Sequence, residues 1–430
     1  MPIFELTFRP GVTTHVEVDE RNLLFYAVHR KTEAIPNQVQ VIEDALANPI
    51  DSKPLEALLW PGDSVIIIVD DITRPTPTTK LLPPILARLE RAGIPDNAVS
   101  IFMALGTHRP MTDDELRVKL GDAAMARYRV INRNYRDGDY VDLGATESGV
   151  PIEVSREIMD ADVRIALGNI VPHITSGWGG GSKIILPGVC SQKTVDRMHY
   201  VGCTMQPVLD ILGVRDNLPR VEMDDVAAKI GLHFIVNTVL DENQQMLGVF
   251  AGHFVEAHRA AVALAQKVMV VPIPKPADIV IVSAYPCHFD YWQGIKPYVF
   301  AHLAVRKGGV LIFLLDGVER LCGDAPAHED TVRTYLPLTV AEQVAAVERG
   351  EIDDLAGLNV PLYHAMVHQR VQKTICVTNH LAPEDLALLA FDSAPDVQTA
   401  LERAYDLMGR DATVGIIPFG GETLTRISGR

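Results

Sequence analysis

Short, continuous runs of β-branched and other apolar residues recur along the chain, and amphipathic stretches separate them. Such runs are typical of strands that are buried on both faces of a parallel sheet. Helices are predicted near residues 80–91 and over 112–120, where Thr112 and Glu115 can form a capping box. The alternation predicts an α/β fold with mostly parallel sheets. The predicted strands are 64–70, 99–104 and 163–167, then 279–282, 310–315, 374–377 and 413–418.

A proline-rich segment, residues 271–276, interrupts this pattern and predicts a domain boundary. We expect an N-terminal α/β domain over residues 1–271, which contains a glycine-rich loop, and a C-terminal α/β domain over residues 272–430. The last predicted strand, within about 412–430, suits either domain, including a return to the N-terminal one. Ligands of such folds bind beyond the carboxyl ends of the strands, and we expect an active-site cleft between the two domains.

Composition narrows the function classes. At 430 residues the chain is too long for one core. Its net charge of -16 disfavours nucleic acid and anionic membranes as partners. No apolar run reaches the roughly 18 residues of a membrane span, and residues 1–5 show no secretory signal. Five scattered cysteines without C-x-x-C spacing fit a reducing compartment, so the expected location is the cytoplasm.

The richest feature is a glycine run that ends in a lysine. Four of the five residues over 177–181 are glycine, and Lys183 follows. Glycine costs conformational entropy and packs nothing, so such a run suggests that backbone must approach a ligand closely. A lysine there can act as a cation or as a nucleophile. The run therefore predicts a cofactor cradle, and Trp178 and the apolar residues 184–186 favour a buried loop over a flexible surface one.

Two familiar nucleotide-binding motifs do not match this run. A P-loop needs glycine before the lysine and Ser or Thr after it, whereas Ser182 precedes Lys183 and Ile184 follows it. The dinucleotide fingerprint needs glycine or alanine at its sixth position, where this run has Ser182, and an acidic residue about 20 residues later at the end of a second strand, which is also missing here.

Polar residues stand where three predicted strands end. Asp70, Asp71, Thr73 and Arg74 follow the first strand, His108 follows the second, and His173 follows the third. Three such ends favour one shared site. Simpler interpretations remain open: the aspartates and Thr73 could cap the next helix, Arg74 could be a surface charge, and His108 could be an ordinary loop histidine.

These residue types suit acid/base chemistry on a carboxylic acid. Histidine transfers protons near neutral pH, so His108 and His173 could serve as a pair of bases on opposite faces of a substrate. Two such bases would allow an enzyme to make either stereoisomer. Arg74 and Lys296 are candidate clamps for a carboxylate.

Together the motifs resemble the nickel-pincer lactate racemases and their 2-hydroxyacid racemase and epimerase relatives. The resemblance covers nearly the whole chain in the right order. It rests on Asp71-x-Thr73-Arg74-Pro75, Gly106-Thr107-His108-Arg109, Pro172-His173, Gly177-Trp178-x-Gly180-Gly181-x-Lys183 with His199, and Gln293-x-x-Lys296.

The resemblance implies a racemase or epimerase that interconverts stereoisomers of a 2-hydroxyacid. It implies a nickel-pincer nucleotide, pyridinium-3-thioamide-5-thiocarboxylic acid mononucleotide with Ni(II), linked covalently to Lys183 and supplied by cofactor-maturation enzymes. His108 and His173 would deprotonate the hydroxyl of either stereoisomer, while hydride passes reversibly to the cofactor. His199 would bind nickel. The other implied residues are Asp71, Thr73, Gly180 and Gly181 for the cofactor, and Arg74, Gln293, Lys296 and Trp292 for the substrate.

The loop before Gln293 departs from the lactate racemase pattern. His288, Asp290 and Trp292 stand where that pattern has Asp, Asn and Tyr, and the family's late pocket tryptophan has no counterpart, Tyr363 being a weak stand-in. Since Asp290 would repel a second carboxylate, we expect a small or medium monocarboxylic 2-hydroxyacid. The alternatives are an NAD-type 2-hydroxyacid dehydrogenase, a cofactor-free racemase, and a non-catalytic ligand-binding homologue.

Overall fold

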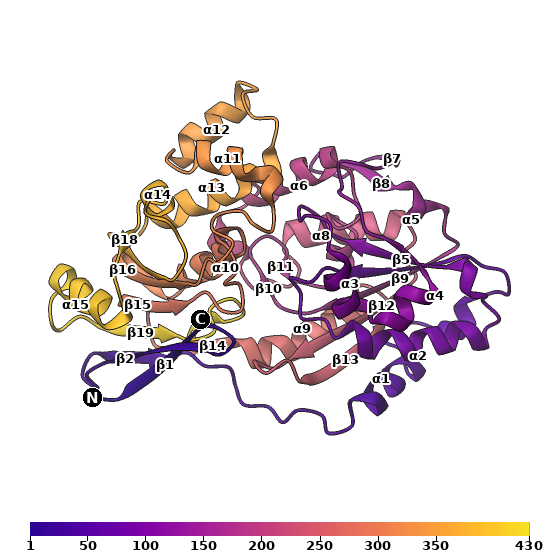
Figure 1. The fold of residues 1–430 in the computed structure, drawn as a ribbon, viewed down its shortest axis with the longest axis horizontal. Coiled ribbons are helices and arrows are strands. Elements are labelled where there is room, and N and C mark those ends of the chain that lie inside the picture. Colours follow the sequence, from indigo (N-terminus) through magenta and orange to yellow (C-terminus); the bar gives the residue numbers. More distant parts are fainter. Residues whose placement is uncertain (430) are drawn as a thin grey trace. The chain divides into compact units, whose positions relative to one another are not determined.

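The computed structural model describes residues 1–429 of the chain, which divide into two compact units (Figure 1). The N-terminal unit contains residues 31–205 and 214–267, and the C-terminal unit contains residues 1–30, 206–213 and those from 268 onward. Each unit is built around one six-stranded sheet. The predicted α/β class with two largely parallel sheets is confirmed.

The sheet of the N-terminal unit has the order β13-β12-β9-β4-β5-β6. All neighbours are parallel except β12 and β13, which form an antiparallel pair at one edge. Its central strands are fully buried and β-branched, as the apolar runs predict. The strands are β4 (Val65–Asp70), β5 (Val99–Ala104), β6 (Arg129–Ile131), β9 (Val163–Asn169), β12 (Phe234–Leu240) and β13 (Met246–Gly252).

Helices and two small hairpins complete this unit. Apolar side chains of α1 and α2 join alternate residues of β4, β5 and β9 in one core. The predicted capping box at Thr112 opens α3. The hairpins are β7 (Tyr140–Ala145) with β8 (Pro151–Ser155), and β10 (Pro172–His173) with β11 (Gly177–Trp178). The helices are α1 (Gln38–Ala47), η1 (Leu55–Leu58), α2 (Thr78–Arg91), η2 (Asp96–Ala98), α3 (Asp113–Leu120), α4 (Asp122–Arg127), α5 (Arg156–Asp160), η3 (Gly181–Ile184), α6 (Gln192–Thr204), α8 (Leu218–Lys229) and α9 (Glu256–Met269).

The sheet of the C-terminal unit is parallel throughout, with the order β18-β17-β16-β15-β19-β3. Two shorter pairs accompany it: the antiparallel hairpin β1 (Ile3–Arg9) with β2 (Val12–Glu17), and the parallel pair β14 (Val270–Ile273) with β20 (Leu424–Ile427). The sheet strands are β3 (Leu23–Tyr26), β15 (Ala277–Ser283), β16 (Val305–Leu315), β17 (Lys373–Thr378), β18 (Asp392–Ser393) and β19 (Val414–Ile417).

Alternate residues of β16 serve the two faces of this sheet. Ile312 and Leu314 join a core with α15 and the β1–β2 hairpin, whereas Phe313 packs edge-to-face against Tyr298 of α10. Both faces are therefore covered, as a parallel sheet requires. The helices are α7 (Val208–Ile211), α10 (Tyr291–Ala301), η4 (Pro326–His328), α11 (Glu329–Tyr335), α12 (Val340–Glu348), α13 (Leu355–His368), α14 (Pro383–Leu388) and α15 (Val397–Met408).

The observed division differs from the predicted domains 1–271 and 272–430 at the start of the chain. Residues 1–30 belong to the C-terminal unit, because β3 pairs with β19 and extends its sheet. Strand β19 stays in that sheet and β20 pairs with β14, so the end of the chain does not return to the N-terminal unit. A single sequence does not reveal this pairing, since its partners are almost the whole chain apart. Within residues 1–429, no helix combines the length and the apolar character that a membrane span needs.

Candidate active site

Three of the predicted polar strand ends lie on neighbouring strands of the N-terminal unit. Strand β4 runs parallel between β5 and β9, so the residues that follow the three strands emerge at the same edge of the sheet. These residues include Asp71, His108 and, through the β10–β11 hairpin, His173.

The first feature of this edge is a carboxylate–imidazole pair. Nδ1 of His108 lies 2.6 Å from Oδ2 of Asp71, and the two residues are only 8% and 4% exposed. Burial alone would raise the pKa of Asp71, but the charge and the hydrogen bond of His108, with Arg74 and Thr73, hold it well below its usual range. The ionised carboxylate accepts the proton of Nδ1, so whenever the imidazole of His108 is neutral its lone pair is on Nε2.

Asp71 also organises the turn that follows β4. Its Oδ1 accepts hydrogen bonds from the backbone N–H of Thr73 at 2.9 Å and from the Thr73 hydroxyl at 2.5 Å. The guanidinium of half-buried Arg74 donates to that hydroxyl at 2.7 Å. Asp71 does not cap a helix, because α2 begins after Pro77. Arg74 is thus held by the same network as His108.

Asp70, its neighbour, ties helix α3 to the same turn. Its Oδ1 lies 2.7 Å from Nζ of the buried Lys119, which also donates to the carbonyl of Arg74 at 2.9 Å. Burial raises the pKa of Asp70, against the opposing effect of Lys119. Lys119 could not be predicted from its sequence position, since a lysine on an amphipathic helix normally faces water.

His173 is held in the opposite way. It stands in the β10–β11 hairpin, and its Nδ1 accepts hydrogen bonds from the backbone N–H groups of Thr175 and Ser176 at 3.2 and 3.3 Å. An imidazole nitrogen that accepts is unprotonated, so neutral His173 carries its proton on Nε2. The sheet edge therefore combines one imidazole with a basic Nε2 and one with an Nε2–H.

The glycine run is a buried loop, as Trp178 and residues 184–186 predict. Trp178 is fully buried, and its carbonyl and that of Gly180 accept hydrogen bonds from Arg220, which is itself buried. His258 Nε2 donates to the carbonyl of Gly179 at 3.0 Å. Burial lowers the pKa of His258 well below its usual value, which keeps the ring neutral, and lowers that of Arg220 to about 10. Buried side chains of α8 and α9 thus hold the loop in place through hydrogen bonds to its carbonyls.

Glycine is required in this loop by the packing of the protein itself. A Cβ on Gly177 would lie 2.0 Å from the carbonyl oxygen of Val214, and one on Gly181 would lie 2.8 Å from the ring of His258. Both residues also have positive φ, at 70° and 55°. This reason differs from the predicted approach of a ligand. Arg220, His258 and Asn237, which accepts from the Gly181 N–H at 2.9 Å, were not foreseen from the sequence.

Lys183 and His199 lie on consecutive elements after the run. Lys183 is half-buried in η3, and His199 is half-buried in α6. Nδ1 of His199 donates to the carbonyl of Val195 at 2.7 Å, which places the lone pair of the neutral ring on Nε2. That tautomer is the one that can bind a metal through Nε2. The described residues contain no group of three or more His, Cys, Asp or Glu that could hold a metal.

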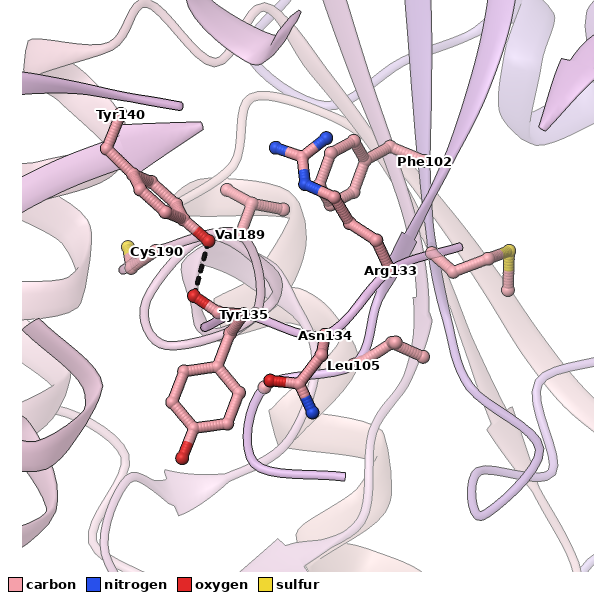
Figure 2. A pocket seen from close by; sticks show the side chains of 11 residues that line it. Phe102, Leu105, Arg133, Asn134, Tyr135, Tyr140, Val189 and Cys190 are labelled. Atoms are coloured by element: carbon pink, nitrogen blue, oxygen red, sulfur yellow. Dashed lines mark hydrogen bonds between the residues drawn. The ribbon is translucent and has the colours of Figure 1, made fainter. Parts of the chain in front are cut away.

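A pocket marks where the turn that carries His108 meets the loop after Lys183 (Figure 2). The two segments touch directly, since the N–H of Gly106 donates to the carbonyl of Gly188 at 3.4 Å. The hydroxyl of Tyr140 donates to the carbonyl of Tyr135, and Arg133 is paired with Glu157. The pocket is lined by Phe102, Met103, Leu105, Gly106, Arg133, Asn134, Tyr135, Tyr140, Gly188, Val189 and Cys190.

Three of the four predicted substrate residues lie in the C-terminal unit and share the first two turns of α10. Gln293 and Trp292 are buried, Lys296 is half-buried, and its Nζ donates to Oε1 of Gln293. Trp292 stacks on His328 with ring centroids 4.9 Å apart and planes 7° from parallel. Fully buried His328 lies 2.7 Å from Oδ1 of Asp354. No sequence spacing links His328 to α10 or to Asp354, so its role could not be predicted.

Comparison with known proteins decides the family. Residues 11–208 match the lactate racemase N-terminal domain, and residues 273–424 match the lactate racemase C-terminal domain. The chain belongs to the lactate racemase family. The lactate racemases of Thermoanaerobacterium thermosaccharolyticum and Lactiplantibacillus plantarum are 29% and 28% identical to it, with coverage of 91% and 89% of this chain and 91% and 90% of theirs.

Solved structures agree with this membership of the lactate racemase family. The lactate racemase apoprotein from T. thermosaccharolyticum has a TM-score of 0.88 at 26% identity, over 99% of this chain and all of that one. A protein from Thermotoga maritima shares the fold, with a TM-score of 0.71 at 21% identity over 93% of this chain and all of its own.

Proposed function

We propose that this chain is a racemase or epimerase of a small or medium monocarboxylic 2-hydroxyacid. The observation that carries the proposal is the pair of differently held imidazoles at one sheet edge: His108 with a lone pair on Nε2 against ionised Asp71, and His173 with a proton on Nε2. A carbon that bears a hydroxyl is a poor carbon acid, so a base at the hydroxyl and a hydride acceptor at the carbon form a reasonable route.

Residues around Lys183 fit the nickel-pincer nucleotide that the family resemblance implies. The donor set is suitable, because His199 offers an imidazole nitrogen of the kind that Ni(II) accepts and its tautomer is set by the carbonyl of Val195. Lys183 ends a loop whose carbonyls accept hydrogen bonds from Arg220 and His258, so the protein's own side chains hold the loop in place. When bound, the cofactor would supply a hydride acceptor. Lys183 would hold it covalently, His199 would bind its nickel, and Asp71, Thr73, Gly180 and Gly181 would contact it.

The proposed proton steps begin at His108. Its Nε2 takes the proton of the substrate hydroxyl, and the resulting imidazolium is stabilised by Asp71. His173 donates a hydrogen bond from Nε2 to a substrate oxygen in the conformation described. A base role for His173 with the other stereoisomer requires its ring to turn or its two backbone hydrogen bonds to break. We therefore expect His108 to contribute more to the rate than His173.

Substrate binding is assigned to Arg74 through its planar fork and to Lys296 as a point charge, with Gln293 and Trp292 beside Lys296. The expectation that Asp290 repels a second carboxylate is wrong. Asp290 is fully buried and caps α10, so it presents no charge to a substrate. The preference for a monocarboxylic acid now rests on the similarity to relatives named lactate racemase, since lactate carries one carboxylate.

The test is a turnover panel on protein that was co-expressed with the cofactor-synthesis enzymes. Intact-protein mass first establishes whether a nucleotide is attached to Lys183. D- and L-enantiomers of lactate, 2-hydroxybutyrate, a larger aromatic 2-hydroxyacid and malate are then followed by chiral chromatography. Interconversion of a monocarboxylic acid is the expected result. Preference for malate contradicts the substrate class, and NAD-dependent turnover without interconversion would favour the dehydrogenase alternative.

A further inference from the structure

The first turn of α10 is bound by the loop of residues 320–324. The backbone N–H groups of Tyr291 and Trp292 donate to the carbonyls of Arg320 at 2.9 Å and Leu321 at 2.8 Å. These donors belong to the first turn of a helix, which has no partners for them within the helix itself. The loop is therefore attached to the helix by backbone hydrogen bonds, which do not depend on the side chains of the loop.

The side chain of Asp290 also links the helix to this loop. Its Oδ1 accepts from the backbone N–H of Gln293 at 2.8 Å, and its Oδ2 accepts from the backbone N–H of Asp324 at 2.9 Å. One buried carboxyl thus joins the helix and the loop. The backbone of Asp324 is therefore held by hydrogen bonds that do not involve its own side chain.

The side chain of Asp324 determines how the amide of Gln293 is oriented. Its Oδ2 lies 2.7 Å from Nε2 of Gln293. An ionised carboxylate can only accept, so the amide must turn its NH₂ group toward Asp324 and its oxygen toward Lys296. The ammonium of Lys296 can only donate, and it donates to that oxygen. The hydrogen bonds therefore run from the Lys296 ammonium to the Gln293 amide and from that amide to Asp324, and the amide can be oriented in only one way.

We propose that Asp324 is a positioning residue, which sets the orientation of the Gln293 amide and through it anchors the ammonium of Lys296 for the substrate carboxylate. This inference rests on the proposed function, in which Gln293 and Lys296 bind substrate. An anchored ammonium needs less ordering when the substrate arrives than one on a mobile stem.

Two variants of Asp324 separate its charge from its hydrogen bond. Asp324→Leu removes both, and we expect the KM for the preferred 2-hydroxyacid to rise about tenfold with a smaller change in kcat. Asp324→Asn keeps an acceptor for Gln293, and we expect a rise of only about threefold. Glu319→Gln, a loop variant that removes a nearby exposed charge, serves as the control with a KM near that of wild type. Wild-type KM in Asp324→Leu would overturn the proposal.

A double-mutant cycle tests whether Asp324 acts through Gln293. In the background Gln293→Met, the further change Asp324→Leu should alter KM by less than about twofold, because the amide that Asp324 orients is already gone. Effects that multiply in the double variant would mean that Asp324 acts by another route, and the proposal would be wrong.

A readout on protein without cofactor keeps this inference separate from the proposed function. Acetylation of Lys296 by an amine-reactive reagent, followed by peptide mass spectrometry, reports how firmly its ammonium is held. Asp324→Leu and Gln293→Met should both raise the labelling rate of Lys296 several-fold relative to the exposed Lys193 in the same molecule. An unchanged rate in both variants would overturn the link from Asp324 to Lys296. Failure of the loaded wild type on every 2-hydroxyacid would instead overturn the proposed function.

Discussion

The two units hold their candidate residues in different ways. In the N-terminal unit, Asp71 and His108 follow parallel strands and meet at the edge of the sheet, 2.6 Å apart. In the C-terminal unit, Gln293 and Lys296 lie on a helix, and their partner Asp324 comes from a loop 31 residues away from Gln293. The first arrangement follows from sheet topology, and the second depends on tertiary hydrogen bonds between segments without a common pattern.

This difference predicts different sensitivities. The strand-end residues touch the groups proposed to react, so their loss should reduce the rate by orders of magnitude. The α10 residues are expected to orient substrate, so their loss should appear mainly in KM.

Lys183→Ala should abolish racemisation and cofactor retention. The residue is half-buried at the end of a loop that other side chains hold, so the free energy of unfolding should change by less than about 1 kcal/mol. Activity, intact mass and thermal unfolding are the measurements. Lys193→Ala, ten residues later and exposed, is the matched control and should behave as wild type. Nucleotide that stays covalently attached to Lys183→Ala would refute the assignment of this lysine.

Asp71→Asn should lower kcat by about 10²–10⁴-fold, since a neutral amide no longer fixes the tautomer of His108 or stabilises its imidazolium. Because the two enantiomers of a 2-hydroxyacid have equal free energy, kcat/KM must fall by the same factor in both directions. Asp162→Asn is the control: Asp162 accepts from Ser64 at the other end of the same strands. If Asp71→Asn affects mainly KM, the contrast between the two units fails.

His173→Ala should also impair both directions, but less than His108→Ala, because His173 presents an Nε2–H in the conformation described. A loss toward the lower end of the 10²–10⁴-fold range for an acid/base group is expected. Nitrogen-15 chemical shifts of the two imidazoles provide an independent check on their tautomers. Equal activity of His108→Ala and wild type would return His108 to the role of an ordinary buried histidine.

The stability of the C-terminal unit should also depend on pH through Asp290. Burial, with the nearby charge of Asp324, raises the pKa of Asp290 to about 7. A raised folded-state pKa means that its contribution to stability is complete below the unfolded-state pKa of about 3.9 and is lost as pH rises through about 7. Asp290→Asn should flatten this loss in denaturant unfolding measured from pH 4 to pH 8. Asp290→Asn that retains the full wild-type slope would contradict the assignment of the slope to this carboxyl.

Much of the fold could be predicted from the sequence because the buried parallel strands are continuous β-branched runs. Strands β4, β5, β15, β16, β17 and β19 lie within two residues of their predicted ranges at most ends, although β16 begins earlier, at Val305. The sheet membership of β3 could not be predicted, because it is short, half-exposed and pairs with a strand at the far end of the chain.

The site divides along a similar line. Asp71, His108 and His173 could be placed from the rule for strand ends, and the capping box of α3 from local spacing alone. Arg220, His258, Lys119, Asp324 and His328 could not, because each acts through a hydrogen bond or ring contact with a segment distant in sequence. Nothing in their own neighbourhoods distinguishes them from ordinary helix or loop residues.

The pairing of β3 with β19 also has a consequence during synthesis of the chain. Residues 23–26 leave the ribosome early, but their partner, residues 414–417, is made roughly 390 residues later. At about 5–20 residues per second, this interval lasts roughly 20–80 s. The N-terminal unit, which lies between them in sequence, can complete its sheet during that time. Strand β3 must therefore wait, as an unpaired edge-strand segment open to chaperones, until nearly the last residues have been added.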